Sequence, residues 1–158
     1  LYGNKLLSYR VGDLRARQLL SDWITHLAAN LTGQRIDTIC IHRGRNNTAA
    51  VTKLNSLDAA TCEVHLEKLL TLYNDGIRSP VFLPPEISRY FVTQFNEQDV
   101  LESALTKTRQ NWDIDDPGAE CRDRYWARLF VMPAAMDAQF QGNARELWQP
   151  LLDSQADA

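Results

Sequence analysis

The spacing of apolar residues changes twice in the first third of the chain. Residues 5–11 and 36–42 carry the alternating and β-branched pattern of strands, and residues 49–54 repeat it after a turn at residues 44–47. Between the first two strands, an apolar stripe at helical spacing predicts a helix that Asp13 caps and Gly33 ends. The stripe consists of Leu20, Trp23, Ile24, Leu27 and Leu31. This order predicts a strand, a helix and then a β-hairpin.

The remainder of the chain is mostly helical in pattern. One helix begins near Asp58 and ends with Gly76 as its C′ residue, and "SPVFLPP" at residues 79–85 is an extended connection because of its prolines. Pro85 then starts a short helix, and Asn96 with Asp99 is expected to cap the next one. Later helices centre on residues 125–130, ended by Pro133, and 140–151. The aromatic residues expected in the core are Trp23, Tyr73, Tyr90, Trp112 and Trp126.

These patterns predict one α/β domain over residues 1–158. It has a small central sheet flanked by helices and a helical C-terminal half. The 158 residues are 44% hydrophobic, which suits a globular core, and the net charge of −3 argues against a strongly electrostatic, free-standing nucleic-acid binder. A local basic patch is still compatible with this charge. The sequence has no apolar run of membrane-spanning length and no signal peptide. Because it starts at Leu1 rather than Met, we expect a C-terminal fragment of a larger subunit or a processed chain.

Three widely spaced cysteines indicate a reducing compartment without a disulfide framework. Cys40 with His42, and Cys62 with His65, each supply half of a conceivable zinc site, but neither pair has the usual ligand spacing. Cys40 falls in an apolar strand and Cys62 on the apolar stripe of a helix, so both are expected to be small buried hydrophobes. The sequence predicts no cofactor and no metal centre.

The candidate chemistry lies in the predicted hairpin. A nuclease of the restriction-endonuclease-like class holds a divalent metal with one carboxylate on a first strand and another on the next, two residues before a lysine. Asp37 and Lys53 match the first and last of these groups, but Val51 stands where the second carboxylate is needed. One carboxylate is a poor Mg²⁺ site. We therefore expect Asp37 to be structural, with a backbone or arginine partner. The alternative is an active Mg²⁺-dependent nuclease that recruits a carboxylate from elsewhere, such as Glu63.

Basic residues gather around the same hairpin. Possible phosphate contacts are Arg35, Arg43, Arg45 and Lys53. A second set, Arg122, Arg124 and Arg128, is interspersed with acidic residues and is typical of a solvated helix face. These basic residues leave open a third reading, an independent DNA-binding module.

Four segments carry a resemblance to a known family. They are "KLLSYRVGDLRARQLLSDWITHLAANL" (5–31), "LEKLLTLYNDGIRSPVFLPPEIS" (66–88), "ECRDRYWARLF" (120–130) and "ELWQPLL" (146–152). In order and spacing they resemble the C-terminal domain of RecC, the gamma subunit of exodeoxyribonuclease V. The hairpin also resembles the nuclease domain of RecB-type proteins. The stretch "DIDDPGAECRDR" departs from the family pattern because it is longer and more charged.

The resemblance implies a restriction-endonuclease-like fold that has lost its catalytic residues, with Asp37, Val51 and Lys53 as the remnant. It also implies a non-catalytic, cytoplasmic domain that scaffolds subunit assembly and DNA strand handling during double-strand-break repair and recombination. The partners would be RecB-like and RecD-like subunits of a heterotrimer, with DNA in the full complex, an ATP-dependent exodeoxyribonuclease and helicase. We expect an exposed apolar patch for these partners, with Phe82, Leu83, Trp148 and Leu152 as candidates.

Overall fold

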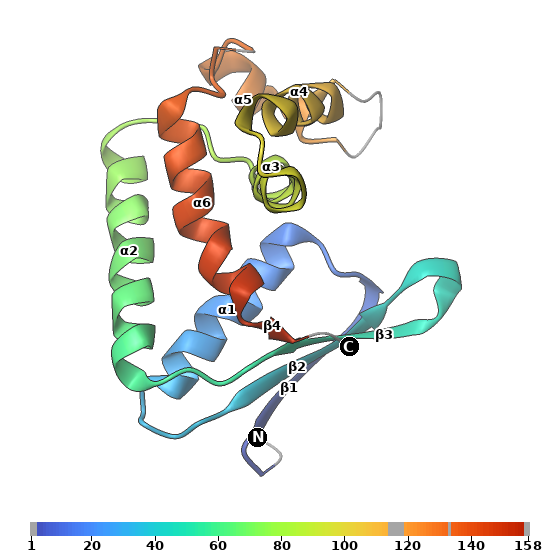
Figure 1. Cartoon of the computed structure of the whole chain (residues 1–158), viewed down its shortest axis with the longest axis vertical. Helices are drawn as coiled ribbons and strands as arrows, with labels where there is room; N and C mark the ends of the chain where they lie inside the picture. Colours follow the sequence, from blue (N-terminus) through green and yellow to red (C-terminus); the bar gives the residue numbers. More distant parts are fainter. Residues whose placement is uncertain (1–2, 114–118, 133, 157–158) are drawn as a thin grey trace. The chain divides into compact units, whose positions relative to one another are not determined.

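A four-stranded mixed sheet forms the framework of the first part of the chain. Its strands are β1 (Lys5–Asp13), β2 (Asp37–Arg43), β3 (Ala49–Leu54) and β4 (Gln155–Ala156), in the order β1-β2-β3-β4. β1 and β2 are parallel and are joined through helix α1 (Ala16–Asn30), whereas β2, β3 and β4 pair antiparallel (Figure 1). The strand–helix–hairpin order predicted from the sequence is confirmed. The two-residue strand β4 was not predicted.

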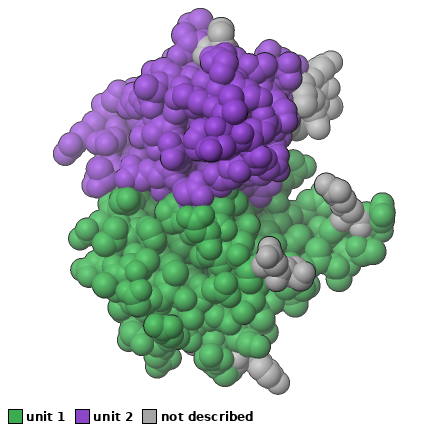
Figure 2. Space-filling model, viewed as in Figure 1, with its two compact units in different colours: residues 1–70, 150–158 green, residues 71–149 purple. Residues whose placement is uncertain are grey.

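The computed structural model describes residues 3–113, 119–132 and 134–156, and within these the chain forms two compact units. Unit 1 comprises residues 1–70 and 150–158, and unit 2 comprises residues 71–149 (Figure 2). Pro133, which is expected to end the helix at residues 125–130, lies outside the described residues. A single domain over residues 1–158 stays a prediction.

Helix α1 covers one face of the sheet in unit 1. Of its predicted stripe, Trp23 and Leu27 are buried, but Ile24 (44% exposed) and Leu31 (43% exposed) are not, and Leu19 is the third large core residue instead. The expected cap was wrong: Asp13 ends β1, and Arg15 precedes the helix with its N–H bonded to Gln18 Oε1 at 3.1 Å. The strand pattern simply extends two residues further than expected. Gly33 ends the turn after the helix with φ +83°, which a residue with a side chain rarely adopts.

A buried hydrogen-bond network joins α1 to the start of β2. Asn30 Nδ2 donates to the carbonyl oxygens of His26 (2.9 Å) and Ile36 (2.8 Å), and Asn30 Oδ1 accepts from the Ile36 N–H at 2.9 Å. His26 Nδ1 lies 2.8 Å from Thr38 Oγ1. Because buried backbone groups need partners, Asn30 fixes where the chain leaves the helix and enters β2.

Helix α2 (Ala59–Arg78) follows the hairpin. Asp58 begins it as expected, since its Oδ1 accepts from the Thr61 N–H at 2.9 Å. The predicted end at Gly76 was wrong, because Gly76 does not adopt a positive φ and the helix continues to Arg78. Tyr73 is also not a core residue: 66% of it is exposed. Helical spacing identified the stripe, but no described neighbour buries this part of it.

Unit 2 is built around Phe82 in the extended connection between α2 and helix α3 (Pro85–Gln98). The further helices are α4 (Leu101–Trp112), η2 (Glu120–Arg122), α5 (Arg124–Leu129) and α6 (Ala138–Asp153), the last of which continues into unit 1. The Phe82 ring lies between 5.1 and 5.8 Å from four aromatic rings, those of Trp112, Trp126, Phe130 and Phe140. Trp112 is buried in this cluster, which confirms it as a core residue. Trp126 in the cluster and Tyr90 on α3 are only half-buried.

The ends of α3 differ from expectation. Asp99 does not cap α4 with Asn96; it ends α3 in the left-handed region at φ 50°, and Val100 precedes α4. At the other end, Pro85 starts the helix as predicted, but Pro84 has no side-chain acceptor to cap it. Glu120 supplies one from η2, accepting from the N–H groups of Glu86 (3.1 Å) and Ile87 (3.0 Å). Arg122 lies in η2, apart from Arg124 and Arg128 in α5.

Candidate functional site

The hairpin of β2 and β3 brings Asp37 and Lys53 together, on the face of the sheet opposite α1. Lys53 Nζ lies 3.2 Å from Asp37 Oδ2, and the backbone N–H of Ser56 donates to Asp37 Oδ1 at 3.0 Å. Partial burial alone would raise the pKa of Asp37, but the Ser56 N–H and the Lys53 ammonium outweigh it and lower that pKa below its usual 3.8. Asp37 therefore has the backbone partner expected for it, together with a lysine.

Val51 lies beside this pair, and it is apolar. It is two residues before Lys53 on β3 and directly opposite Ile41 of β2, so its side chain shares the face with Asp37 and Lys53. Glu63, the alternative second carboxylate, is exposed on α2. Within residues 3–113, 119–132 and 134–156, no three His, Cys, Asp or Glu side chains are placed to hold a metal ion together. The hairpin therefore offers a metal ion one carboxylate, that of Asp37, and Lys53 already binds it.

The basic residues of the hairpin do not form one cluster. Arg43 makes two hydrogen bonds to Asp13, at 2.9 and 3.2 Å, and Lys53 is engaged by Asp37. The Arg43 guanidinium lowers the pKa of Asp13, which in turn raises the pKa of Arg43. Arg35 precedes β2 and Arg43 ends it, and a seven-residue strand is roughly 20 Å long. The side chain of Arg45 lies outside the described part of the structure.

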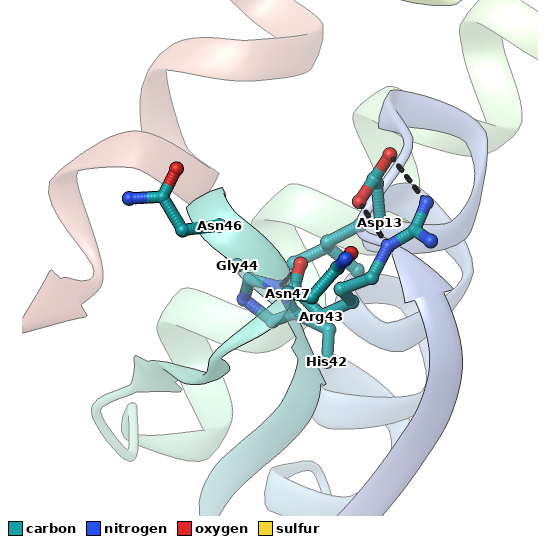
Figure 3. Close-up of a pocket in the computed structure, with 7 residues that line it drawn as sticks. Asp13, His42, Arg43, Gly44, Asn46 and Asn47 are labelled. Atoms are coloured by element: carbon teal, nitrogen blue, oxygen red, sulfur yellow. Dashed lines mark hydrogen bonds and ion pairs between the residues drawn. The ribbon is translucent and has the colours of Figure 1, made fainter.

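A pocket of about 590 Å³ opens at the tip of the hairpin. Its lining is Asp13, Leu14, His42, Arg43, Gly44, Asn46 and Asn47. Figure 3 shows Asp13 and Arg43 facing each other, with Asn46 on the other side of the turn. Asn46 and Asn47 both have φ 58°, a region that asparagine tolerates, and a Cβ on Gly44 would come within 2.8 Å of Ala50 Cβ. The sequence predicted this turn, but not that it borders a pocket.

One comparison with known proteins decides the family. The family model described as "RecC C-terminal domain" matches residues 1–96. The chain belongs to the RecC C-terminal domain family. The match covers more than half of the 158 residues and includes the whole of β1, α1 and the β2–β3 hairpin. No curated protein matches the chain. Membership links this RecC-type chain to the RecBCD complex, exodeoxyribonuclease V, and to DNA repair.

Cys40 and Cys62 of this RecC-family chain are not in disulfides and are buried as expected. Cys40 Sγ lies 3.4 Å from Asp22 Oδ2, and burial raises the pKa of that thiol to about 11, so it stays protonated. Asp22 was not singled out from the sequence. Its carboxylate also binds Arg10 Nη2 at 2.9 Å and Ser8 Oγ at 3.3 Å, which makes it the polar link between α1 and β1.

Two of the expected interface residues of the RecC-family chain are core residues instead. Phe82 is 5% exposed at the centre of its aromatic cluster, and Trp148 is fully buried with its indole N–H donated to Ser88 Oγ at 2.8 Å. The expectation that they form an exposed apolar patch was wrong. Leu83 and Leu152 are half-buried. In the described part of the chain, no helix is long and apolar enough to cross a membrane.

Proposed function

We propose that this chain is a non-catalytic, nuclease-like domain of a RecC subunit that scaffolds subunit assembly and DNA strand handling during double-strand-break repair and recombination. The observation that carries the proposal is Val51. It occupies the position of the second metal carboxylate, beside an Asp37 whose oxygens are bound by Lys53 and the Ser56 N–H. A metal would have to displace the lysine and would gain one carboxylate only.

The restriction-endonuclease-like ancestry of the sheet is part of this proposal. It is supported by the hairpin, which sets an aspartate and a lysine side by side on adjacent strands, as that nuclease class requires. We propose further that the chain is one domain of a larger cytoplasmic subunit, within a heterotrimer that includes RecB-like and RecD-like subunits. The ATP-dependent nuclease and helicase activities would then reside in the complex rather than in this domain.

The nuclease assay separates the proposal from its alternative. The purified chain, incubated with linear duplex or single-stranded DNA and Mg²⁺ or Mn²⁺, should cleave neither substrate. Asp37→Ala, Lys53→Ala and Glu63→Ala variants should be indistinguishable from the wild type. Metal-dependent cleavage that Asp37→Ala or Lys53→Ala abolishes would overturn the proposal, whereas cleavage that survives both substitutions would indicate a contaminating nuclease.

A DNA titration separates it from an independent DNA-binding module. Arg43 is paired to Asp13 and Lys53 to Asp37, so two of the four basic residues proposed as phosphate contacts are already bound by carboxylates. The isolated chain should therefore bind duplex ends at physiological salt with a Kd no better than ~10⁻⁵ M, in the non-specific range. Submicromolar affinity for a DNA end without a partner subunit would favour the binding module.

A further inference from the structure

The face of the sheet opposite α1 is apolar and uncovered. Helix α1 covers one face of the sheet (Figure 1). Thr38 and Cys40 are on that face, because both are buried and hydrogen-bonded to His26 and Asp22 of α1. Five large apolar residues on the other face and along β1 are exposed: Leu7 49%, Tyr9 83%, Val11 92%, Ile41 41% and Val51 48%. All five belong to unit 1, and they are exposed with every described residue of the chain in place.

The register of the strands makes four of these residues neighbours, while Val11 lies in the irregular stretch of β1 between Tyr9 and Asp13. Tyr9 pairs with Ile41, and Ile41 pairs with Val51, so one row crosses three strands. Leu7 pairs with Ile39 in the row beside it. Adjacent strands are ~4.8 Å apart, so the patch is about 10 Å wide, and residues 7 to 11 extend it over roughly 13 Å. With its side chains it covers on the order of a few hundred Å², the size of the largest apolar patch of a typical monomer, which is often a functional one.

The composition of β2 indicates that this face belongs under a second layer. In "DTICIHR", Thr38 and Cys40 point to α1 while Ile39 and Ile41 point away, so both faces of the strand are apolar or β-branched. Strands of that kind are typical of α/β sheets that are packed on both sides, whereas a strand with one solvated face alternates with polar residues. The second layer is absent from the described chain.

The charges around the patch favour a protein over a nucleic acid. Asp37 and Lys53 compensate each other at one end of the patch, and Asp13 and Arg43 do so at the other. Lys5, whose charge acts on Asp37, adds a single positive charge. A surface with two mutually neutralised ion pairs around an apolar centre suits an apolar ligand with acidic residues at the Lys5 end. It offers few contacts to a phosphate backbone.

We propose that this face, the open face of the sheet in unit 1, is the docking site for one amphipathic helix of a partner subunit. A helix is 10–12 Å across, about the width of the three strands. A second copy of the chain packed face to face would bury a few hundred Å² on each side, well below the ~800 Å² per partner of a stable interface. Tyr9, the largest side chain of the row and 83% exposed at its β1 end, is the aromatic anchor expected of such a site. The inference rests on the proposed role in subunit assembly and names its surface.

The test uses the full chain co-expressed with the RecB-like and RecD-like subunits of the same source. Tyr9→Lys and Val51→Lys place a charge on the open face, where burial under an apolar helix would desolvate it. Each should weaken capture of a partner subunit at least tenfold. Tyr125→Lys is the matched control, because Tyr125 is 62% exposed on α5 in unit 2, and capture should be unchanged. Thermal unfolding of each variant verifies that the fold is intact.

A photo-cross-linking amino acid in place of Tyr9 identifies the occupant in the assembled complex. The expected product is a cross-link to a helical segment of a partner subunit. A cross-link to a second copy of the chain, to the chain itself or to DNA overturns the inference, and so does the absence of any cross-link. If the wild-type chain captures a partner and Tyr9→Lys captures it equally well, the docking face is wrong and the proposed assembly role stands. If the wild type captures neither subunit, both fail.

Discussion

The two faces of the sheet in unit 1 share one backbone but differ in what their side chains do. On the covered face, Thr38 and Cys40 are buried and bonded to His26 and Asp22 of α1. On the open face, Ile41 and Val51 are exposed. The covered face therefore carries the free energy of folding, whereas the open face can change its chemistry at little cost to stability. Position 51, on the open face, can therefore carry either an apolar or a charged side chain without loss of the fold.

The largest expected difference between the faces is at their aromatic residues. Trp23→Ala removes a side chain that is 1% exposed beneath the covered face, and it should lower the free energy of unfolding by about 3–5 kcal/mol. Tyr9→Ala on the open face should change it by less than about 0.5 kcal/mol. Urea denaturation of the two variants measures both values. Similar losses would show that the open face is also part of the stabilising core.

Asn30→Ala should cause the next largest loss, about 2–4 kcal/mol, because three buried hydrogen bonds disappear and the backbone groups of Ile36 stay unpaired. Asn55→Ala is the matched control in unit 1, since Asn55 is exposed, and it should be close to neutral. Equilibrium denaturation compares the two. A loss for Asn30→Ala as small as for the control would mean that water replaces the amide, and the network would then not define the start of β2.

The two faces should also lose stability in different pH ranges. Burial lowers the pKa of His26 below its usual 6.5, so near that pH the folded chain binds fewer protons than the unfolded chain. Stability is then complete above pH 6.5 and falls as the pH drops below it. On the open face, the Ser56 N–H and Lys53, and not burial, lower the pKa of Asp37. The stability that Asp37 contributes is therefore complete above pH 3.8 and is lost only below that value.

Thermal unfolding between pH 8 and pH 3 measures this separation. His26→Gln should flatten the loss that begins near pH 6.5, and any remainder there should come from His65, whose pKa burial also lowers. Asp37→Asn should leave that part of the curve unchanged. A wild-type curve that is flat from pH 7 to pH 5 would contradict the assignment of His26 as a buried neutral group.

The smallest effect concerns the ion pair on the open face. Lys53→Met removes the partner of Asp37 but leaves the Ser56 N–H in place, and both side chains are partly exposed to solvent that screens them. We expect a loss of about 0–1 kcal/mol, measured by urea denaturation in low and high salt. A loss above about 2 kcal/mol would make the pair a structural element of the fold and not a remnant.

The sequence predicted most of unit 1, because hydrophobic periodicity reports local structure directly. The hairpin, the helix α1 with its buried Trp23 and Leu27, and the buried Cys40 and Cys62 all follow from it. What it could not predict depends on contacts between distant segments. Phe82 looks exposed in a proline-rich connection until four aromatic rings surround it, and Asp13 looks like a helix cap until Arg43 pairs with it.

The candidate site shows the same division between local pattern and tertiary contact. Alternation alone places Val51 and Lys53 on one face of β3. It also shows that no carboxylate stands two residues before the lysine. Which face of β2 is covered could not be decided, because Ile39 and Ile41 are as apolar as the residues on the other side.

Strand β4 has a consequence for how this chain can be trimmed or synthesised. It pairs with Lys53 and Leu54, and the Asn55 N–H donates to Ser154 O at 2.8 Å, so unit 1 is assembled from segments separated by about a hundred residues of sequence. A ribosome that has released residues 1–70 has made most of the sheet but not its last strand. Truncation at residue 96, where the family match ends, would leave that edge of β3 unpaired and open to association with other chains.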